Sequence, residues 1–346
     1  KNIVIASGAR PWVLDIQGLD QINYLTSDTV WQLSELPERM LVIGAGPIGC
    51  ELAQSFARLG SKVSVIDMAP RVLPREDEEA SELVRQALIE DGVEFVLNAT
   101  IKGFELLSQQ QQIMLEQDGR AFSVCFDQVL FAVGRKANTE GFGLEGLGIE
   151  RNPNGTLVVN EYLQTKYQNI YACGDVAGPY QFTHMAAHQA WYAAVNALFG
   201  RFKKFKVDYR VVPWATFTDP EVARVGVSES EAEAQGLNYE VTRYGLDDLD
   251  RAIADGEAEG FVKVITQTGS DKILGVTIAG YHASELIAEW VLAMKYGLGL
   301  NKMLGTIHIY PTLNEANKYA AGVWKREHKP EAVLRWVERF HNWQRR

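Results

Sequence analysis

The sequence is poor in the residues that form disulfides and metal centres. Its 346 residues include three cysteines, Cys50, Cys125 and Cys173, and these stand in no C-x-x-C pair. The six histidines are dispersed; His184 and His188 share helical spacing, but no carboxylate lies in that turn. We therefore expect three free thiols packed as small apolar side chains, and no metal site.

Long apolar runs and an excess of basic charge are also missing. The chain has 34 Lys or Arg against 44 Asp or Glu, a net charge of −10, which argues against a nucleic-acid partner. No apolar run is long enough to span a bilayer, and the start shows no signal-peptide pattern, so the sequence favours a cytoplasmic location. The length and an apolar content of 47% predict about two or three globular domains.

The most informative segment is a glycine fingerprint between a predicted strand and a predicted helix. Residues 40–43 are apolar and lead into G-x-G-x-x-G, and an apolar pattern of helical period follows as far as Leu59. In a dinucleotide-binding turn the first glycine permits the tight turn, the second lets the backbone approach the pyrophosphate, and the third lets helix and strand pack closely. The helix N-terminus adds free N–H groups and a positive dipole end. The predicted binding residues are Gly44, Gly46, Pro47, Ile48 and Gly49.

An acidic residue completes this unit. The next predicted strand, residues 63–66, ends in Asp67. A carboxylate at that position accepts hydrogen bonds from both hydroxyls of the adenosine ribose of NAD and repels the 2′-phosphate of NADP. Arg71 lies four residues further on, where it would soften that repulsion. The sequence therefore favours NAD over NADP.

Two segments of the chain resemble each other. Residues 3–11 read as a strand followed by a glycine turn, and residues 129–135 repeat this pattern where the dinucleotide unit closes. If the first segment closes an equivalent unit, the glycine fingerprint of that unit lies before residue 1. We therefore expect a nucleotide-binding half to be missing from this chain.

The remaining pattern predicts a mixed chain of helices and strands. Before residue 211 we expect helices at 78–90 and 184–199, strands at 93–97 and 170–172, and a strand through Cys125. A hairpin turn is expected at Gln109–Gln112, in a β-meander that continues to Asp118-Gly119. From residue 211, expected strands at 215–217, 222–225, 261–265 and 273–278 and helices at 228–235 and 283–296 indicate a separate α+β domain.

The tail from Lys325 onward is predicted to form an amphipathic basic helix. One helical face carries Val333, Trp336, Val337 and Phe340, with Arg335, Arg339, Arg345 and Arg346 around it. We expect this helix to pack on its own protein; docking on a membrane surface or on a partner is the alternative.

Several motifs occur together in one order. They are Gly44-x-Gly46-x-x-Gly49-x-Glu51, Val133-Gly134-Arg135 followed by Asn138-Thr139, Cys173-Gly174-Asp175, Phe217-Thr218-Asp219-Pro220-Glu221 and Tyr310-Pro311-Thr312-Leu313-Asn314-Glu315. With this set the chain resembles the pyridine nucleotide–disulfide oxidoreductases, the flavoprotein family of dihydrolipoyl dehydrogenase, glutathione reductase and mercuric reductase. Residues 51–63 and 250–264 are most similar to the mercuric reductase branch.

The resemblance implies an α/β fold with a definite domain order. A Rossmann-like NAD(P) domain at 37–150 is inserted in an incomplete FAD-binding domain, made of residues 1–36 and 151–210. An α+β dimerisation domain at 211–324 and the helix at 325–346 follow. The implied activity passes hydride from NAD(P)H through FAD to a disulfide or another small-molecule acceptor, in a homodimer.

The resemblance also implies roles for single residues. FAD contacts are implied for Ser7, Gly8, Gly174 and Asp175, and NAD contacts for Gly134 and Arg135. Asp175 matches the aspartate that bonds the ribityl chain. Glu51 matches a residue near the nicotinamide and flavin rings; as an alternative it is an acid interacting with the helix dipole.

Two departures from the family pattern qualify the expected activity. Tyr310 stands where the family has its catalytic histidine, and a phenol of pKa near 10 is a poorer base at neutral pH than imidazole. Glu315 keeps the position of the carboxylate that orients that histidine. The paired C-terminal cysteines of mercuric reductases are missing, and the redox-active cysteine pair of the family would precede residue 1.

These departures leave two alternatives open. One is an NADH oxidase or transhydrogenase type of flavoprotein, in which no disulfide takes part. The other is a non-catalytic NAD-binding and dimerisation module. This chain alone is expected to lack the half of the FAD-binding domain that binds the ADP moiety of FAD, and it is therefore expected to be inactive.

Overall fold

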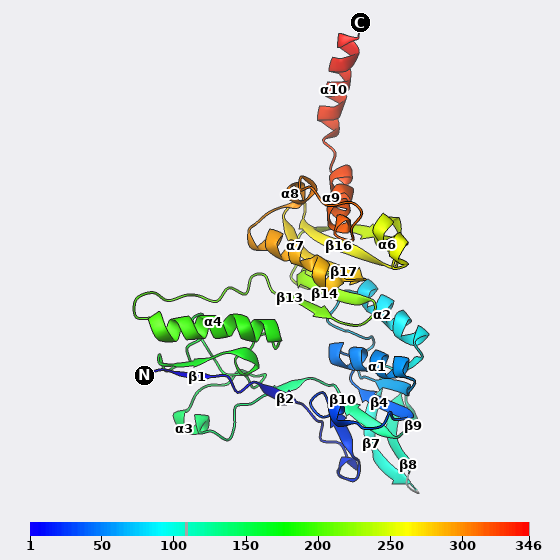
Figure 1. The fold of residues 1–346 in the computed structure, drawn as a ribbon, viewed down its shortest axis with the longest axis vertical. Coiled ribbons are helices and arrows are strands. Elements are labelled where there is room, and N and C mark those ends of the chain that lie inside the picture. The colour runs from blue at the N-terminus through cyan, green and yellow to red at the C-terminus, as the bar shows by residue number, and fades with distance from the viewer. Residues whose placement is uncertain (108–109, 346) are drawn as a thin grey trace. The chain divides into compact units, whose positions relative to one another are not determined.

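The computed structural model describes residues 1–107 and 110–345. The chain folds as two compact units (Figure 1). The first comprises Lys1–Pro74 and Leu88–Tyr209, and the second comprises Arg75–Ala87 and Arg210–Arg346.

A five-stranded parallel sheet forms the centre of the first unit. Its strand order is β3 (Tyr24–Thr26), β10 (Gln128–Phe131), β4 (Arg39–Ile43), β5 (Lys62–Ile66) and β6 (Val93–Val96). The strands are apolar runs because both faces of a parallel sheet are covered. Helix α1 (Pro47–Leu59) follows β4, and α2 (Glu78–Glu90) precedes β6, as predicted. The segment before residue 37 supplies the edge strand β3, and its three residues gave no periodic signal in the sequence.

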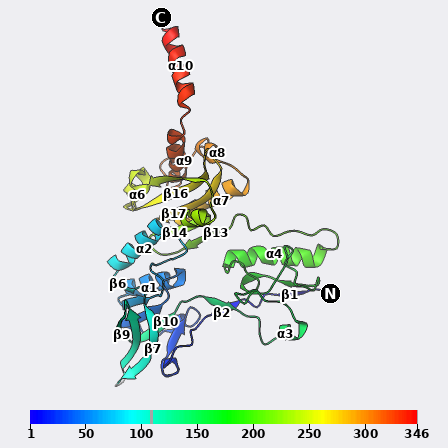
Figure 2. The same cartoon turned by 180° about the vertical axis from the view of Figure 1, so that it is seen from behind.

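A separate antiparallel meander contains β7 (Thr100–Leu107), β8 (Gln110–Gln117) and β9 (Arg120–Phe126), shown in Figure 2. Asp118 and Gly119 both have positive φ, which confirms the predicted second turn. Of the predicted turn Gln109–Gln112, Gln109 lies outside the described residues, and the other three residues belong to β8. The predicted strand around Cys125 is confirmed as β9.

The end of the first of the two similar segments pairs with the strand that begins at the end of the second. β2 (Ala9–Pro11) is antiparallel to β11 (Arg135–Ala137), with Ala9 opposite Ala137. β1 (Ile3–Ile5) is parallel to β12 (Ile170–Ala172). The first unit also contains α3 (Leu144–Leu147), α4 (Thr183–Phe199) and the short 3-10 helices η1 (Leu19–Gln21), η2 (Val30–Gln32) and η3 (Gly174–Val176).

The second unit is built on an antiparallel sheet. Its strand order is β13 (Pro213–Thr216), β14 (Glu221–Gly226), β17 (Ile273–Gly280), β16 (Gly260–Gln267) and β15 (Tyr239–Gly245). Its helices are α5 (Glu229–Ala234), α6 (Asp250–Asp255), α7 (Ala283–Lys295), α8 (Leu300–Leu304), α9 (Glu315–Glu327) and α10 (Glu331–Gln344), with η4 (Leu246–Asp248). Helix α7 packs against β14 and β17, and α9 against β15 and β16 (Figure 1). The fully buried Trp290 on α7 lies in their shared core.

Residues 75–87 contact this sheet through buried charges. Arg224 on β14 has no exposed surface, and its Nε lies 3.0 Å from Oε2 of Glu76. The Arg224 guanidinium also donates to Glu231 and stacks on the ring of Trp214 at 4.4 Å. Lys263 donates to Asp77 at 2.8 Å. The sequence analysis placed residues 75–87 in the nucleotide domain because charged pairs across such distances leave no local pattern.

The tail differs from its prediction in two ways. Helix α9 continues past residue 325 to Glu327, since Trp324 is anchored in the core at 5% exposure, and a separate helix, α10, starts after Pro330. All of α10 is described by the structure, and none of its residues is buried. The expected packing of this helix on its own chain is therefore not found. Within the described ranges, no helix has the length and hydropathy required to cross a membrane.

Candidate functional site

In the glycine turn after β4, two glycines are required because a side chain there would clash with the protein's own backbone. A Cβ on Gly44, where φ is +109°, would lie 2.6 Å from the carbonyl oxygen of Ala132. A Cβ on Gly49 would lie 1.8 Å from the carbonyl oxygen of Gly44. At Gly46, by contrast, no described atom lies within 4 Å of the position a Cβ would take. Gly46 therefore leaves free space beside the backbone, where a pyrophosphate would fit.

The N-terminus of α1 lies at this turn, and its first turn has no acidic side chain to neutralise the positive end of the helix dipole. Gly46 is the N-cap, Pro47 is the first helical residue, and Ile48 and Gly49 complete the uncharged first turn. The first N–H groups of a helix have no intrahelical acceptor and carry the positive end of the dipole. Glu51 lies two positions beyond Gly49 and is partly exposed. The donor set fits a phosphate group.

Asp67 is brought to the same turn. Its Oδ2 accepts a hydrogen bond from the N–H of Ala45 at 2.6 Å, and its Oδ1 accepts one from the N–H of Ala69 at 2.8 Å. The ends of β4 and β5 are adjacent in the parallel sheet, which explains the approach. Arg71 donates to the carbonyl of Pro74 at 3.0 Å. The carboxylate is thus fixed beside the predicted phosphate site.

The cysteines beside the glycine motifs are packed as predicted. Burial raises the pKa of the Cys50 thiol to about 12, and burial also raises the pKa of Cys173. Cys125 is partly exposed on β9, and all three are free. The described residues contain no group of three His, Cys, Asp or Glu side chains arranged to hold a metal ion.

The predicted flavin-side residues meet at a second turn. Gly174 has φ +76°, and its N–H donates to Oε1 of Gln189 at 2.7 Å, while Nε2 of Gln189 donates to the carbonyl of Gly178. Burial raises the pKa of the neighbouring Asp175, and the Arg135 charge partly offsets this. A partly desolvated carboxylate is stabilised by hydroxyl donors, so Asp175 fits a ribityl chain.

Hydrogen bonds connect the N-terminal segment, at Ser7 and Gly8, to the loop at Asn138. Ser7 Oγ donates to the carbonyl of Asn138 at 2.6 Å, and the N–H of Asn138 donates to the carbonyl of Gly8, where φ is +67°. Arg135, predicted at the NAD site, instead donates to the carbonyl of Ala9 at 2.7 Å and lies 3.8 Å from Asp175. Next to it, Gly134 has φ +116°.

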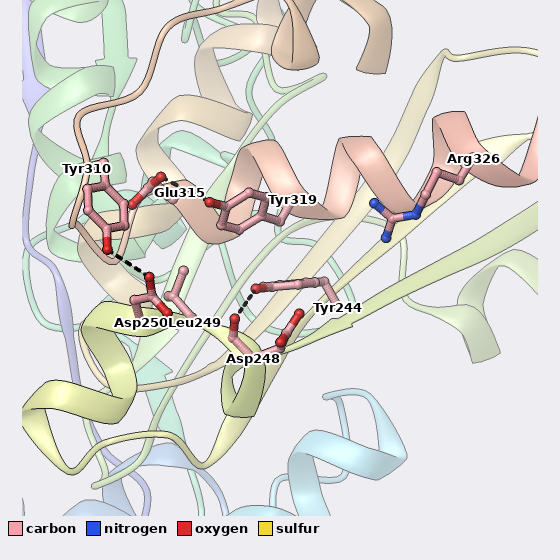
Figure 3. A pocket seen from close by; sticks show the side chains of 8 residues that line it. All are labelled: Tyr244, Asp248, Leu249, Asp250, Tyr310, Glu315, Tyr319 and Arg326. Carbon is pink, nitrogen blue, oxygen red and sulfur yellow. Dashed lines mark hydrogen bonds between the residues drawn. The ribbon is translucent and has the colours of Figure 1, made fainter.

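A third cluster surrounds Tyr310 in the second unit. A cavity of about 260 Å³ is lined by Tyr244, Asp248, Leu249, Asp250, Tyr310, Glu315, Tyr319 and Arg326 (Figure 3). The Tyr310 hydroxyl donates to Oδ2 of Asp250 at 2.9 Å. Oε1 of Glu315 accepts from the Tyr319 hydroxyl at 3.2 Å, and its Oε2 accepts from the N–H of Thr312 at 3.2 Å. Glu315 thus stabilises the turn into α9.

The electrostatics of this cluster keep its phenols neutral. The hydrogen bond to Asp250 raises the pKa of Tyr310. Burial and the charge of Glu315 raise the pKa of Tyr319. Tyr310 is consequently a hydrogen-bond donor and not a base at neutral pH. The sequence analysis did not single out Asp250 or Tyr319. The i, i+4 spacing from Glu315 is a signal that could have identified Tyr319, but nothing local connects residues 250 and 310.

A buried histidine anchors the loop that carries Tyr310. The side chain of His308 is 3% exposed, its Nε2 lies 3.0 Å from Oε1 of Glu289, and its Nδ1 lies 3.1 Å from the carbonyl of Thr306. Asn317 donates to Glu289 at 2.9 Å and accepts from the indole of Trp290. This network fixes the loop to α7 and α9.

A parallel sheet whose first glycine turn meets a carboxylate from the next strand defines a dinucleotide-binding protein. The chain belongs to the pyridine nucleotide-disulphide oxidoreductase family. The sequence profile of that family matches residues 1–192, and the profile of its dimerisation domain matches residues 212–321. The resemblance and the fold class inferred from the motifs are confirmed.

Two relatives illustrate the branches of the family. Mercuric reductase of Lysinibacillus sphaericus is 37% identical over 330 residues, which cover 94% of this chain and 60% of that protein. Dihydrolipoyl dehydrogenase of Bacillus subtilis is 36% identical over 323 residues, which cover 93% of this chain and 68% of that protein. The chain thus spans between half and three-fifths of the length of the mercuric reductases that it matches.

A solved structure agrees with the fold. The HOCl-induced flavoprotein disulfide reductase RclA of Escherichia coli superimposes with a TM-score of 0.84 at 29% identity. The match covers 93% of this chain and 73% of RclA.

Proposed function

We propose that this chain is the larger part of a flavin-dependent oxidoreductase that passes hydride from NADH to a small-molecule acceptor. The observation that carries the proposal is the bond between Asp67 and the N–H of Ala45. It fixes a carboxylate beside the open face of Gly46, so that one ligand contacts both. That ligand has a pyrophosphate at the glycine turn and a ribose with free hydroxyls at Asp67, which describes NADH.

The preference for NADH over NADPH rests on charge. A ribose 2′-phosphate would place its negative charge against the Asp67 carboxylate. Arg71, the nearest cation in the sequence, donates to the carbonyl of Pro74 and is thus turned toward its own loop. We therefore expect repulsion of NADPH to dominate.

The proposed flavin site uses this chain's second half of an FAD-binding domain. Gln189 holds the turn at Gly174, and Asp175 presents a carboxylate to the ribityl hydroxyls. Bound FAD would supply the electron relay between nicotinamide and acceptor. Glu51, near the start of α1, is proposed to lie beside the two rings.

The acceptor is proposed to be reached at Tyr310. Its phenol is protonated over the physiological range and 66% exposed, so it can donate a hydrogen bond to an acceptor but cannot take a proton from a thiol. This observation favours, as a second candidate, a flavoprotein whose acceptor step needs no base at this position, such as an NADH oxidase or transhydrogenase.

The protein is proposed to act as a homodimer through the second unit. Ile307 and Ile309, which flank His308 in the Tyr310 loop, are 94% and 77% exposed in the single chain. Apolar side chains in such a position are covered when two copies associate. Tyr310 would then lie at the edge of the interface.

The test uses the full-length protein. The purified protein should carry a flavin absorption band that bleaches on anaerobic addition of NADH. Thiol titration after reduction separates the candidates, because new thiols indicate a disulfide step and their absence indicates an oxidase or transhydrogenase. A colourless protein that still binds NADH would leave only the non-catalytic module.

A further inference from the structure

Helix α10 presents an uncovered aromatic face. Trp336 and Trp343 are 65% and 71% exposed, and Val333 and Phe340 on the same face are also exposed. The ring of Phe340 lies 5.8 Å from that of Trp336 and 6.1 Å from that of Trp343. The three rings form one continuous strip along the helix, which we call the aromatic strip. A strip of this size left in water is unfavourable and marks an interaction surface.

The charge around the aromatic strip differs from that of the rest of the protein. Residues 325–346 contain seven Lys or Arg and three Asp or Glu, in a chain whose net charge is −10. Arg335 and Arg339 are on α10 itself, and Arg345 follows it. On the helix, Arg335 forms an ion pair with Glu331 at 3.2 Å, and this pair is exposed to solvent and contributes little. The surface is therefore apolar, with arginine side chains along one side of the aromatic strip.

A second copy of α10 is a poor occupant for this strip. Coiled-coil seams use Leu, Ile or Val at the a and d positions and extend over several heptads, whereas α10 has 14 residues with tryptophan and phenylalanine on its seam. The family dimerisation profile ends at residue 321, before α10 begins. The helix thus lies outside the part of the chain that explains a dimer.

A lipid surface with anionic headgroups matches the same features. Tryptophan rings are favoured at the depth of the headgroups, and arginine side chains reach from there to phosphates while their stems stay in the apolar layer. A helix of 14 residues is about 21 Å long, too short for a hydrocarbon layer of about 30 Å, so it would lie in the plane of the interface.

We propose that α10 is a membrane-surface anchor, which inserts its aromatic strip into the headgroup region of a bilayer and pairs its arginines with anionic lipids. The anchor holds the oxidoreductase at the membrane face without crossing it. A 14-residue helix is marginal in water by itself, so lipid binding also stabilises its helical state.

The test measures co-sedimentation of the full chain with two kinds of vesicle, phosphatidylcholine alone and phosphatidylcholine mixed with phosphatidylglycerol. We expect at least about tenfold tighter binding to the mixed vesicles, a blue shift of tryptophan emission, and weaker binding at high salt. The double variant Trp336→Ala/Trp343→Ala should lose binding to both kinds of vesicle. Arg335→Gln/Arg339→Gln should lose the preference for the anionic lipid, by about fivefold per charge.

The matched control is Trp31→Ala, which removes a tryptophan that is 76% exposed in the other unit and should bind vesicles like the parent. Equal binding to the two vesicle types, or no binding, overturns the proposal. So does a fall from dimer to monomer in light scattering of the Trp336→Ala/Trp343→Ala variant, because a second copy would then be the occupant of the aromatic strip.

Discussion

The hydroxyl of Tyr310 donates a hydrogen bond to Oδ2 of Asp250, at 2.9 Å and across 60 residues of sequence. The sequence analysis expects Tyr310 at the position of the family's histidine base, and the hydrogen bond to Asp250 raises the pKa of this phenol. Tyr310 is therefore a proton-bearing hydrogen-bond donor, and a carboxylate of α6 orients it. If the acceptor binds here, as proposed, its reaction proceeds without a base from residue 310.

The first prediction concerns that hydrogen bond. Asp250→Asn removes the charge that raises the pKa of Tyr310, so the phenol should titrate at lower pH. The titration is followed by NMR of ring-labelled tyrosine, with Tyr310→Phe identifying the signal. Asp248→Asn is the matched control, because Asp248 lines the same cavity and bonds Tyr244 through its backbone carbonyl. An unchanged Tyr310 titration in Asp250→Asn contradicts the account.

The second prediction separates binding from folding at the glycine turn. Gly46→Ala places a methyl group in space that the protein leaves free, so the melting temperature should be unchanged. Calorimetric titration should nevertheless show NADH binding weakened by at least about tenfold, because the methyl group occupies the pyrophosphate position. Gly146→Ala, also facing no described atom within 4 Å, is the control and should bind NADH normally. Normal NADH binding by Gly46→Ala would place the pyrophosphate elsewhere.

The third prediction compares a buried and an exposed arginine. Arg224→Met leaves Glu76 buried without its counter-charge and should lower the free energy of unfolding of the second unit by about 3–5 kcal/mol. Arg243→Met removes the arginine of a solvent-exposed pair with Glu79 and should cost less than about 1 kcal/mol. Urea unfolding measures both. Equal costs would show that the pair between Arg224 and Glu76 does not hold residues 75–87 in place.

The fourth prediction is a pH dependence at the end of α9. The hydrogen bond to the carbonyl of Trp324, and then Glu240, raise the pKa of His328 above its usual 6.5. A raised pKa in the folded state means that the stabilisation is complete below pH 6.5 and is lost as the pH rises through the folded value. Stability should therefore fall more between about pH 6 and about pH 9 in the parent than in His328→Gln. His341→Gln, on α10, should keep the parent slope; a parallel slope in His328→Gln refutes the assignment.

The sequence predicted the strand, glycine turn and helix of residues 39–66 well because their signals are local. Gly44, Gly49 and Asp67 have roles that strand, turn and helix geometry dictate within one βαβ unit, and the structure brings them together. The same reasoning missed Gln189 and Asp250, whose partners lie far away in the sequence. It also predicted one tail helix from residue 325 onward, whereas the structure has two helices that are separated near Pro330.

The central claim is that Asp67 selects NADH as the hydride donor of a flavoprotein. Its most direct test is the catalytic efficiency with NADH and with NADPH, measured as flavin reduction in the full-length protein. The account predicts a clear preference for NADH, which Asp67→Asn should lower by about tenfold or more, since the amide keeps the shape but loses the charge-assisted ribose bonds and the repulsion of phosphate. A parent protein that prefers NADPH, or an unchanged ratio in Asp67→Asn, would contradict it.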